Sequence, residues 1–159
     1  MDINSPSIEE TPNEETPSEG AANELVDLTL ESLPDSLRAG VERAGWTKLM
    51  PVQARAIPYL LAQRNVMVQA RTGSGKTGAF LLPMLKRLSA QRKECQALIL
   101  APTRELARQV ANEAEMLFAG TGLRTVAVYG GVGYGPQTEA LTQGAQIVVG
   151  TPGRVLDHL

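Results

Sequence analysis

The sequence predicts an α/β fold in which a parallel sheet carries helices on both faces. Four short apolar runs alternate with helical stretches along the chain, at residues 66–69, 97–101, 124–128 and 146–149. None of these runs alternates apolar with polar residues, which is typical of strands that are buried on both faces. Strands that alternate with helices in this way indicate a parallel sheet covered on both sides.

Helices are expected before and after each of these strands. Residues 34–44 form the first, ended by Gly45, and residues 51–62 form the second, with Pro51 at its first position. Pro58 should kink or shorten the second helix. The later helices are expected at residues 75–90, 104–119 and 136–143 and from about residue 153. Ligands of open parallel sheets bind beyond the carboxyl ends of the strands. We therefore expect one functional rim, formed by residues 70–77, 102–106, 129–135 and 150–154.

Charge is divided unevenly along the chain, although the net charge is only -2. Residues 1–37 contain ten acidic residues and no Lys or Arg, while the rest contains all 15 basic residues and a net charge of +8. Residues 1–24 are poor in apolar side chains, so we expect a disordered acidic tail ahead of one domain at residues 25–159. The tail is either a solvated leader or an autoinhibitory or partner-binding segment that mimics an anionic ligand.

The composition excludes several classes of protein. The single cysteine, Cys95, cannot form an internal disulfide or a cysteine-rich zinc site, and the single histidine, His158, excludes multi-histidine metal sites. No apolar run approaches the roughly 18–20 residues that cross a bilayer, and the acidic N-terminus lacks the apolar stretch of a secretory signal. We therefore expect a cytoplasmic protein that makes no membrane contact.

The strongest single motif is Ala70-Arg71-Thr72-Gly73-Ser74-Gly75-Lys76-Thr77, between a predicted strand and a predicted helix. This context is typical of a phosphate-binding loop, whose backbone N–H groups and helix N-terminus surround a phosphate. Lys76 is expected to reach the β- and γ-phosphates of a nucleotide, and the Thr77 hydroxyl to bind Mg²⁺. Ala70 stands where the usual motif has glycine. The alternative is a glycine-rich turn with an accidental Lys-Thr pair.

With Ala70 included, this loop resembles the A-x-T-G-S-G-K-T form found in DEAD-box ATP-dependent RNA helicases. Other segments match motifs of that family in the same order. Gly45-Trp46 and Pro51-Val52-Gln53 resemble the adenine-recognition motif. The remaining matches are Pro102-Thr103-Arg104-Glu105-Leu106, Gly130-Gly131 and Thr151-Pro152-Gly153-Arg154.

The resemblance runs from about residue 28 to residue 159 and implies a partial RecA-like P-loop NTPase domain that binds ATP and Mg²⁺. It implies catalytic roles for Lys76 and Thr77, with Thr77 as the Mg²⁺ ligand. The cofactor contacts that it implies are Trp46, Gln53, Arg71, Thr72, Gly73, Ser74, Gly75, Lys76 and Thr77.

The resemblance also implies a single-stranded or duplex RNA partner that is bound through its sugar–phosphate backbone. Carried over residue by residue, the RNA contacts are Thr103, Arg104, Gly130, Gly131, Thr151 and Arg154. Backbone contacts of this kind depend strongly on salt and carry little sequence preference.

The same residues also have structural interpretations. Gln53 alone is typical of an ordinary polar helix residue, although its carboxamide suits the N6/N7 edge of adenine. Thr103 suits a helix cap, and the glycine doublet a plain turn. Thr151 and the proline after it suit a helix start. Arg104 places a positive charge at the positive end of the dipole of the helix that it begins, which favours a contact with an anion. Capping does not explain Arg154.

The sequence departs from the family pattern at several positions. Leu28 stands where the family has an aromatic residue that stacks on adenine, which lowers the expected affinity for adenine. Leu49-Met50 replaces the usual Pro-Thr, and Gln146 stands where Asp is common. The D-E-A-D motif, the S-A-T motif and the second RecA-like domain with its arginine finger do not occur, so we expect a truncated sequence, incomplete at the C-terminal end of its domain.

The sequence thus predicts the ATP- and RNA-binding portion of an ATP-dependent RNA helicase, an enzyme that couples ATP hydrolysis to local unwinding of RNA duplexes. The chain alone is expected to be inactive, because the missing motif supplies the magnesium-anchoring Asp and the water-activating Glu. One alternative is a truncated nucleotide- or RNA-binding module without turnover. The other is a P-loop protein unrelated to nucleic acid, which leaves P-T-R-E-L and T-P-G-R unexplained.

Overall fold

A computed structural model describes residues 24–159, so the predicted acidic tail lies outside the described residues except for Glu24. The described part contains a parallel sheet of three strands in the order β1-β3-β2. These strands are β1 (Ala97–Leu100), β2 (Thr125–Val128) and β3 (Ile147–Gly150). The central strand β3 sets the register, since Val148 pairs with Leu98 on one side and with Val126 on the other. The prediction of a parallel α/β sheet is confirmed.

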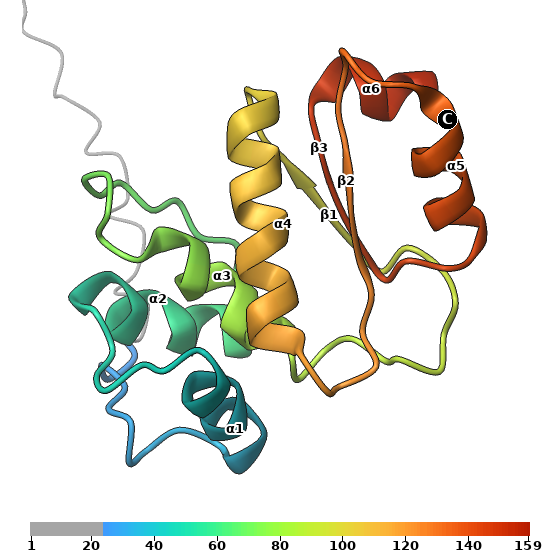
Figure 1. The fold of residues 1–159 in the computed structure, drawn as a ribbon. Helices are drawn as coiled ribbons and strands as arrows, with labels where there is room; N and C mark the ends of the chain where they lie inside the picture. Colours follow the sequence, from blue (N-terminus) through green and yellow to red (C-terminus); the bar gives the residue numbers. More distant parts are fainter. Residues whose placement is uncertain (1–23) are drawn as a thin grey trace, which may run out of the picture.

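Helices cover both faces of this sheet, as predicted (Figure 1). The helix α4 (Arg104–Phe118) packs on one face, and α5 (Tyr134–Thr142) with α6 (Pro152–Asp157) packs on the other. A second group consists of α1 (Asp35–Arg43), α2 (Pro51–Leu61) and α3 (Lys76–Met84). In this group α1 and α3 pack against α4, and α2 packs against α3. No helix within residues 24–159 is long and apolar enough to cross a membrane.

The core forms two clusters because successive side chains of a strand point to opposite faces. Ile147 and Val149 face the larger cluster, where they pack with Leu117 of α4. Val148 faces the smaller cluster, which Val155 of α6 helps to cover. Full burial of each such side chain stabilises the fold by about 1.5–3 kcal/mol relative to exposure.

The expectation of a strand at residues 66–69 is wrong for this structure. The segment makes no ladder, and Met67 is 100% exposed. The outer edge of β1 also has no partner among the described strands, and Leu98 and Leu100 beside it are about half exposed. A strand is stable only where its backbone finds a hydrogen-bonding neighbour. Residues 66–69 instead line a hollow of about 580 Å³ together with residues of α2.

Of the two effects expected of Pro58, a kink or a shorter helix, the shortening does not occur, since α2 continues to Leu61. Proline lacks an N–H, so it leaves the carbonyl four residues earlier without its helical donor. That carbonyl belongs to Ala54, and the N–H of Leu28 donates to it at 3.0 Å. The segment before α1 therefore supplies the hydrogen bond that the proline removes.

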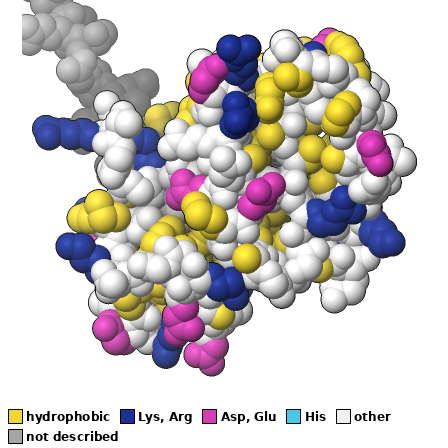
Figure 2. Space-filling view, in the orientation of Figure 1, with side chains coloured by type: hydrophobic (Ala, Val, Ile, Leu, Met, Phe, Trp, Pro, Cys, Tyr) yellow, Lys and Arg dark blue, Asp and Glu magenta, His cyan; other side chains and the backbone are white. Residues whose placement is uncertain are grey.

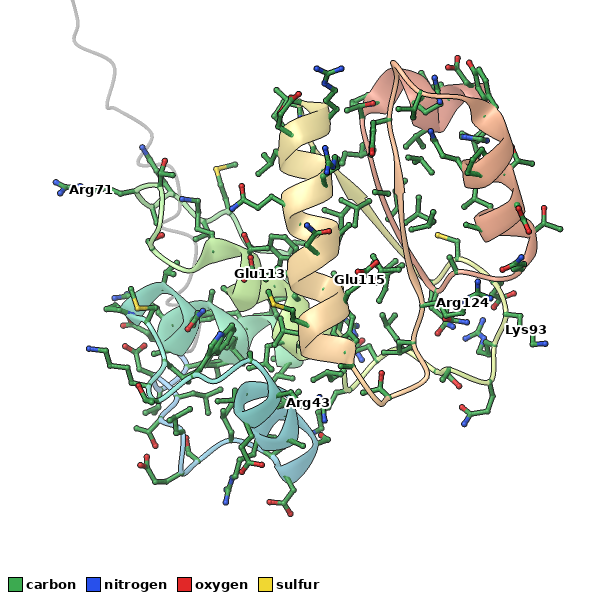
Figure 3. All side chains as sticks on the ribbon, in the orientation of Figure 1. Arg43, Arg71, Lys93, Glu113, Glu115 and Arg124 are labelled. Carbon is green, nitrogen blue, oxygen red and sulfur yellow. The ribbon has the colours of Figure 1, made fainter. Side chains whose placement is uncertain are left out.

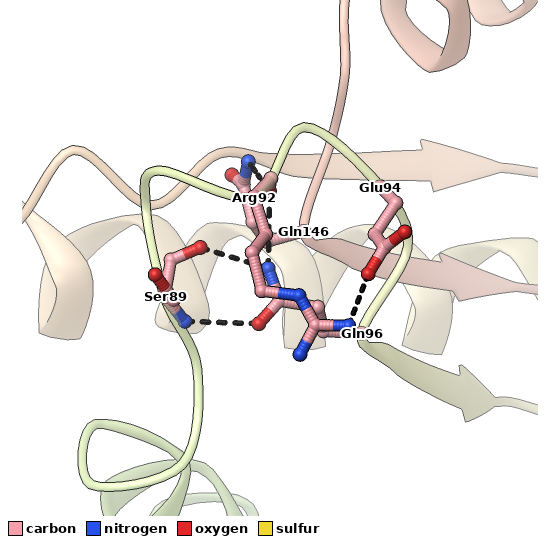
Figure 4. A network of polar contacts seen from close by, with 5 residues as sticks. All are labelled: Ser89, Arg92, Glu94, Gln96 and Gln146. Carbon is pink, nitrogen blue, oxygen red and sulfur yellow. Dashed lines mark hydrogen bonds and ion pairs between the residues drawn. The ribbon is translucent and has the colours of Figure 1, made fainter.

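The other helices lie close to the positions predicted from the sequence, except that α3 ends at Met84 rather than near residue 90. Residues 85–96 form a loop that two glutamines hold in place (Figure 4). The Gln96 carboxamide donates to the Ser89 carbonyl at 2.8 Å and accepts the Ser89 N–H at 2.9 Å. Gln146 donates to the carbonyl of Arg92 at 2.8 Å, which ties the loop to the start of β3.

Candidate functional site

The glycine-rich loop at residues 70–77 curls around its own lysine. Gly73 and Gly75 have φ angles of +76° and +88°, which glycine adopts far more readily than other residues. The Lys76 ammonium donates to the carbonyls of Ala70 and Arg71, each at 2.6 Å. The Ser74 hydroxyl is buried and has no hydrogen-bond partner in the described part of the chain. The loop therefore holds a cation and an unsatisfied polar hydrogen at the N-terminus of α3, which is a suitable environment for an anion.

Gln53 connects this loop to the start of α2. It is 3% exposed, its Oε1 accepts the Met50 N–H at 2.8 Å, and its Nε2 donates to the Gly75 carbonyl at 3.2 Å. Both ends of the carboxamide are therefore engaged by protein, and one of the two amide hydrogens has no acceptor among the described residues. Gln53 therefore has a structural role of its own, because its side chain links α2 to the loop.

Trp46 packs beside the same residues. A Cβ atom placed on Gly78 would lie 2.2 Å from the indole ring of Trp46 and 2.8 Å from Nε2 of Gln53. Glycine is therefore required at this position of α3 by close approach rather than by its backbone angles. The structure brings Trp46, Gln53 and the start of α3 together, as the resemblance to the adenine-recognition motif implied.

Thr77 lies beside a carboxyl group that the sequence did not single out. Glu113 of α4 is half-buried between α4 and α3 (Figure 3). Burial raises the pKa of this carboxyl above its ordinary value of 4.5, and hydrogen bonding by the Thr77 side chain lowers that pKa by a smaller amount. Glu113 and Trp46 also line one cavity of about 330 Å³. No local motif marks Glu113, because its approach to Thr77 depends on how α3 packs on α4.

Two other residues of the loop do not turn inward. Arg71 and Thr72 are exposed, and Arg71 extends away from the rest of the chain (Figure 3). The other expected cofactor contacts thus lie in the loop or beside the start of α3, with the side chains of Arg71 and Thr72 outside this group.

The segments after β1 and β2 meet at Arg104. This residue begins α4 and pairs with Glu105, whose carboxylate raises the pKa of the Arg104 guanidinium. Its Nη1 would lie 3.3 Å from a Cβ on Gly131, so Gly131 lies against this arginine, while a Cβ on Gly130 would meet nothing within 4 Å. Thr103 caps α4 as its structural interpretation predicted, because its Oγ1 accepts the Leu106 N–H at 3.2 Å. The exposed Arg104 and the adjacent glycines leave room for an anionic chain.

The segment after β3 joins the same end of the sheet. The backbone N–H of Thr151 donates to the Val128 carbonyl at 3.0 Å, but the Thr151 side chain makes no cap on α6. Arg154 is only 8% exposed, and its Nη1 donates to the Val132 carbonyl at 3.1 Å. Its guanidinium also lies over the ring of Tyr134, 4.0 Å from the centroid. Arg154 is thus held by protein contacts that capping and motif spacing did not predict.

Charge on the visible face is spread out rather than gathered. Figure 2 shows Lys and Arg side chains around the edge of this face, with Asp and Glu side chains between them. Among the described residues, no group of three or more His, Cys, Asp or Glu side chains could hold a metal ion. On this face, local geometry rather than a broad basic patch therefore defines the candidate residues.

Comparison with known families accounts for this arrangement. Residues 50–159 match the model of the family described as DEAD/DEAH box helicase. The chain belongs to the DEAD/DEAH box helicase family. The matched region contains the glycine-rich loop, Gln53, Arg104, the glycine doublet and Arg154, so the resemblance seen in the sequence is confirmed.

Similar curated proteins are also helicases of this family by name. The chain is 56% identical over 117 residues to the ATP-dependent RNA helicase DeaD of Escherichia coli K12, and covers 18% of it. It is 46% identical over 144 residues to the ATP-dependent RNA helicase RhlB of Xanthomonas campestris, and covers 25% of it. The alignments use 72% and 85% of this chain. The chain thus spans roughly a fifth to a quarter of the length of these relatives.

Solved structures of the family share the fold. A DEAD box protein from the hyperthermophile Methanococcus jannaschii is 41% identical, with a TM-score of 0.76 over 84% of this chain and 37% of that one. A hypothetical ATP-dependent RNA helicase from Sulfolobus tokodaii is 35% identical, with a TM-score of 0.67 over 79% of this chain and 36% of that one. The DEAD/DEAH box helicase chain described here therefore forms an incomplete RecA-like α/β domain, as predicted.

Proposed function

We propose that this chain is the ATP- and RNA-binding portion of an ATP-dependent RNA helicase, which couples ATP hydrolysis to local unwinding of RNA duplexes. Membership of the family and the names of its relatives support this proposal. The observation that carries it is the glycine-rich loop, where, among residues 24–159, the buried Ser74 hydroxyl has no partner and Lys76 donates only to loop carbonyls.

The residues of this loop fit a nucleotide phosphate. A phosphate oxygen would accept a hydrogen bond from the Ser74 hydroxyl, and Lys76 would exchange two carbonyls for a charged acceptor. The left-handed backbone at Gly73 and Gly75 suits N–H groups that converge on an anion. Thr77 would hold Mg²⁺, which neutralises phosphate charge when bound. Lys76 and Thr77 are therefore the proposed catalytic residues.

Trp46 and Gln53 are the proposed contacts of the nucleotide base. Gln53 keeps one amide N–H after its two protein contacts, which leaves it able to donate to adenine. Trp46 packs on α3 beside it and would limit where the base can lie. Arg71 and Thr72 complete the proposed ATP contacts from the exposed side of the loop.

The RNA backbone is proposed to bind at the carboxyl ends of the strands. Arg104 supplies positive charge next to Gly131, where a sugar–phosphate chain can approach the backbone closely. The proposed RNA contacts are Thr103, Arg104, Gly130, Gly131, Thr151 and Arg154. This assignment makes the affinity for RNA sensitive to salt and nearly independent of base sequence.

The nucleotide site can be tested by calorimetric titration of the chain with ATP, with and without Mg²⁺. We expect Lys76→Ala to weaken binding by about tenfold or more, since a charge-assisted contact contributes about 1.5–3 kcal/mol. Thr77→Ala should reduce the gain that Mg²⁺ brings. Lys48→Ala is the matched control, because Lys48 is exposed and lies outside the site. Equal affinities for the Lys76 and Lys48 variants would overturn the assignment.

Turnover is tested in a chimera in which this chain replaces the corresponding part of E. coli DeaD. The proposal predicts RNA-stimulated ATP hydrolysis by the chimera, abolished by Lys76→Ala, and none by the 159-residue chain alone. A chimera that binds ATP and RNA without hydrolysis would favour the module without turnover. ATP hydrolysis that RNA does not stimulate would favour a P-loop protein unrelated to nucleic acid.

The RNA site is tested by fluorescence anisotropy with a labelled oligouridine at increasing salt. Arg104→Ala should weaken binding similarly for oligouridine and oligoadenine, and should reduce the slope of log K against log salt by about 0.7. Lys93→Ala removes the same charge at the opposite end of β1 and should change neither quantity to this extent. A change of base preference with an unchanged slope in the Arg104 variant would contradict a backbone contact.

The acidic tail and a cytoplasmic location belong to the same proposal. If residues 1–24 compete with RNA for the basic domain, their deletion should tighten RNA binding at low salt and have little effect at high salt. An unchanged affinity at low salt would support a solvated leader. Cell fractionation tests the location.

A further inference from the structure

An aromatic residue that the proposed function does not use lies at the same end of the sheet as the proposed RNA contacts. Tyr134 is the first residue of α5 and is 49% exposed. Its ring faces the guanidinium of Arg154, whose Cζ atom is 4.0 Å from the ring centroid. At this distance the quadrupole of a tyrosine ring attracts a cation.

Further contacts restrain the same pair. The Tyr134 hydroxyl donates to Oδ2 of Asp157 at 2.8 Å, and that hydrogen bond raises the pKa of Tyr134. The same Oδ2 lies 3.5 Å from Nε of Arg154. The Nη1 of Arg154 donates to the Val132 carbonyl at 3.1 Å. An aromatic ring, a carboxylate and a carbonyl therefore restrain one guanidinium.

Arg154 nevertheless keeps hydrogen-bond donors that are incompletely satisfied. Within residues 24–159, its Nη1 donates to a carbonyl, while the buried Nε makes no hydrogen bond and has only the ion-pair contact with Oδ2 of Asp157 at 3.5 Å. Native proteins rarely leave a buried donor unpaired, because its lost hydration is not replaced. The remaining donors and the positive charge match the oxygens of a phosphate group, which the fork of a guanidinium binds well.

The surroundings of Tyr134 do not suggest a packing role. Its neighbours Gly133 and Gly135 face open space, since a Cβ on either would touch nothing within 4 Å. The half-exposed side chain has polar and charged partners: the ring faces the Arg154 guanidinium, the hydroxyl binds Asp157, and the centroid of the His158 ring lies 5.6 Å from that of Tyr134. Its position is therefore set by the guanidinium and the carboxylate rather than by the apolar core.

We infer that Tyr134 is a positioning residue for Arg154: its ring holds the guanidinium so that the unused donors meet a phosphate of a single-stranded RNA backbone. The inference rests on the proposed function, in which Arg154 contacts that backbone. A guanidinium held in its binding orientation loses less rotamer entropy on binding than a free one. The ring supplies this effect directly, because the guanidinium lies over it, whereas the hydroxyl contributes through Asp157, which pairs with Arg154.

The test compares Tyr134→Phe, which keeps the ring, with Tyr134→Leu, which removes it, in anisotropy titrations with labelled oligouridine. We expect Tyr134→Leu to weaken binding about three- to tenfold and to lower the salt slope by up to about 0.7. Tyr134→Phe should stay within about twofold of the unchanged chain, since the cation–π contact persists. Tighter binding by Tyr134→Leu would overturn the inference, because the ring would then cover Arg154 rather than position it.

Two further measurements separate this inference from the proposed function. NMR relaxation of the Arg154 Nε–H reports its mobility directly, and it should rise in Tyr134→Leu but not in Tyr134→Phe. Unchanged mobility in Tyr134→Leu overturns the inference whatever happens to RNA. Arg154→Gln should lose affinity, and adding Tyr134→Leu to it should cost little more, since the two changes are coupled. An unchanged RNA affinity in Arg154→Gln overturns the RNA role of Arg154, and with it the RNA part of the inference. Arg104→Ala tests the rest of the RNA site separately.

Discussion

The side chain of Gln53 donates from Nε2 to the backbone carbonyl of Gly75, 3.2 Å away, across 22 residues of sequence. The same carboxamide accepts the N–H of Met50 at 2.8 Å. Helix α2 and the glycine-rich loop are thereby joined through one buried side chain. A change at Gln53 should therefore affect both the stability of the domain and the shape of the loop.

Gln53→Glu tests this joint. A carboxylate still accepts the Met50 N–H but cannot donate to the Gly75 carbonyl, and it adds a charge at a position that is 3% exposed. We expect the free energy of unfolding in urea to fall by about 1–3 kcal/mol at neutral pH. ATP affinity should fall as well, because the loop loses its support. Gln69→Glu is the control, since Gln69 is exposed, and equal losses in both variants would contradict the role of Gln53.

Gly78→Ala should be destabilising although its backbone angles are ordinary. The added methyl would lie 2.2 Å from the ring of Trp46 and 2.8 Å from Nε2 of Gln53. Overpacking of this kind costs about 1–3 kcal/mol. Trp46 is the only tryptophan, so its fluorescence should report the displacement directly. Gly135→Ala, also in a helix but facing open space, should be neutral or slightly stabilising. An unshifted Trp46 emission in Gly78→Ala would show that the ring is not in contact.

The fold was predictable where local pattern decides it. The strands after residue 96, the helices α1, α2 and α4, and the stop at Gly45 follow from apolar runs and from helix start and stop residues. The apolar run at residues 66–69 failed because a strand also needs a neighbour, and a neighbour is a property of the whole sheet.

The candidate site divides in the same way. Motifs marked the loop at residues 70–77 and the arginines at strand ends, because short spacings carry that information. Glu113 beside Thr77 and Tyr134 beside Arg154 were not found, since each pair is joined only by the packing of two helices. Arg154 was expected to contact the RNA backbone, and no spacing rule could reveal that it is 8% exposed.

Glu113→Gln should make the stability less dependent on pH. Burial raises the pKa of Glu113 in the folded chain above its ordinary value of 4.5, so the folded state binds a proton more tightly than the unfolded state. The domain therefore loses stability as the pH rises from 4.5 through the raised pKa. The glutamine removes that loss and should stabilise the domain at neutral pH by less than about 1 kcal/mol, since the side chain is partly solvated. Urea unfolding as a function of pH measures this, with Glu115→Gln, an exposed neighbour, as the control. A steeper loss with rising pH in Glu113→Gln would contradict the assignment.

Gln146 offers the most direct test of how the loop before β1 is held. It is 1% exposed, its Oε1 accepts the Arg124 N–H at 2.8 Å, and its Nε2 donates to the Arg92 carbonyl at 2.8 Å. Gln146→Leu leaves the Arg124 N–H without this acceptor, whereas the Arg92 carbonyl keeps a hydrogen bond from Gln96 at 3.1 Å. One orphaned donor predicts a loss of about 1–3 kcal/mol rather than twice that amount.

Gln146→Glu separates hydrogen bonding from shape at the same position. The carboxylate form still accepts the Arg124 N–H but faces the Arg92 carbonyl with no hydrogen to donate. The protonated form restores that donor, so the pKa of the new carboxyl should be raised in the folded chain, and stability should increase as the pH falls towards it. Gln146→Leu has no titrating group and should show no such recovery. If both variants lost equal stability at every pH, side-chain packing rather than the two hydrogen bonds would hold the start of β3 to the loop.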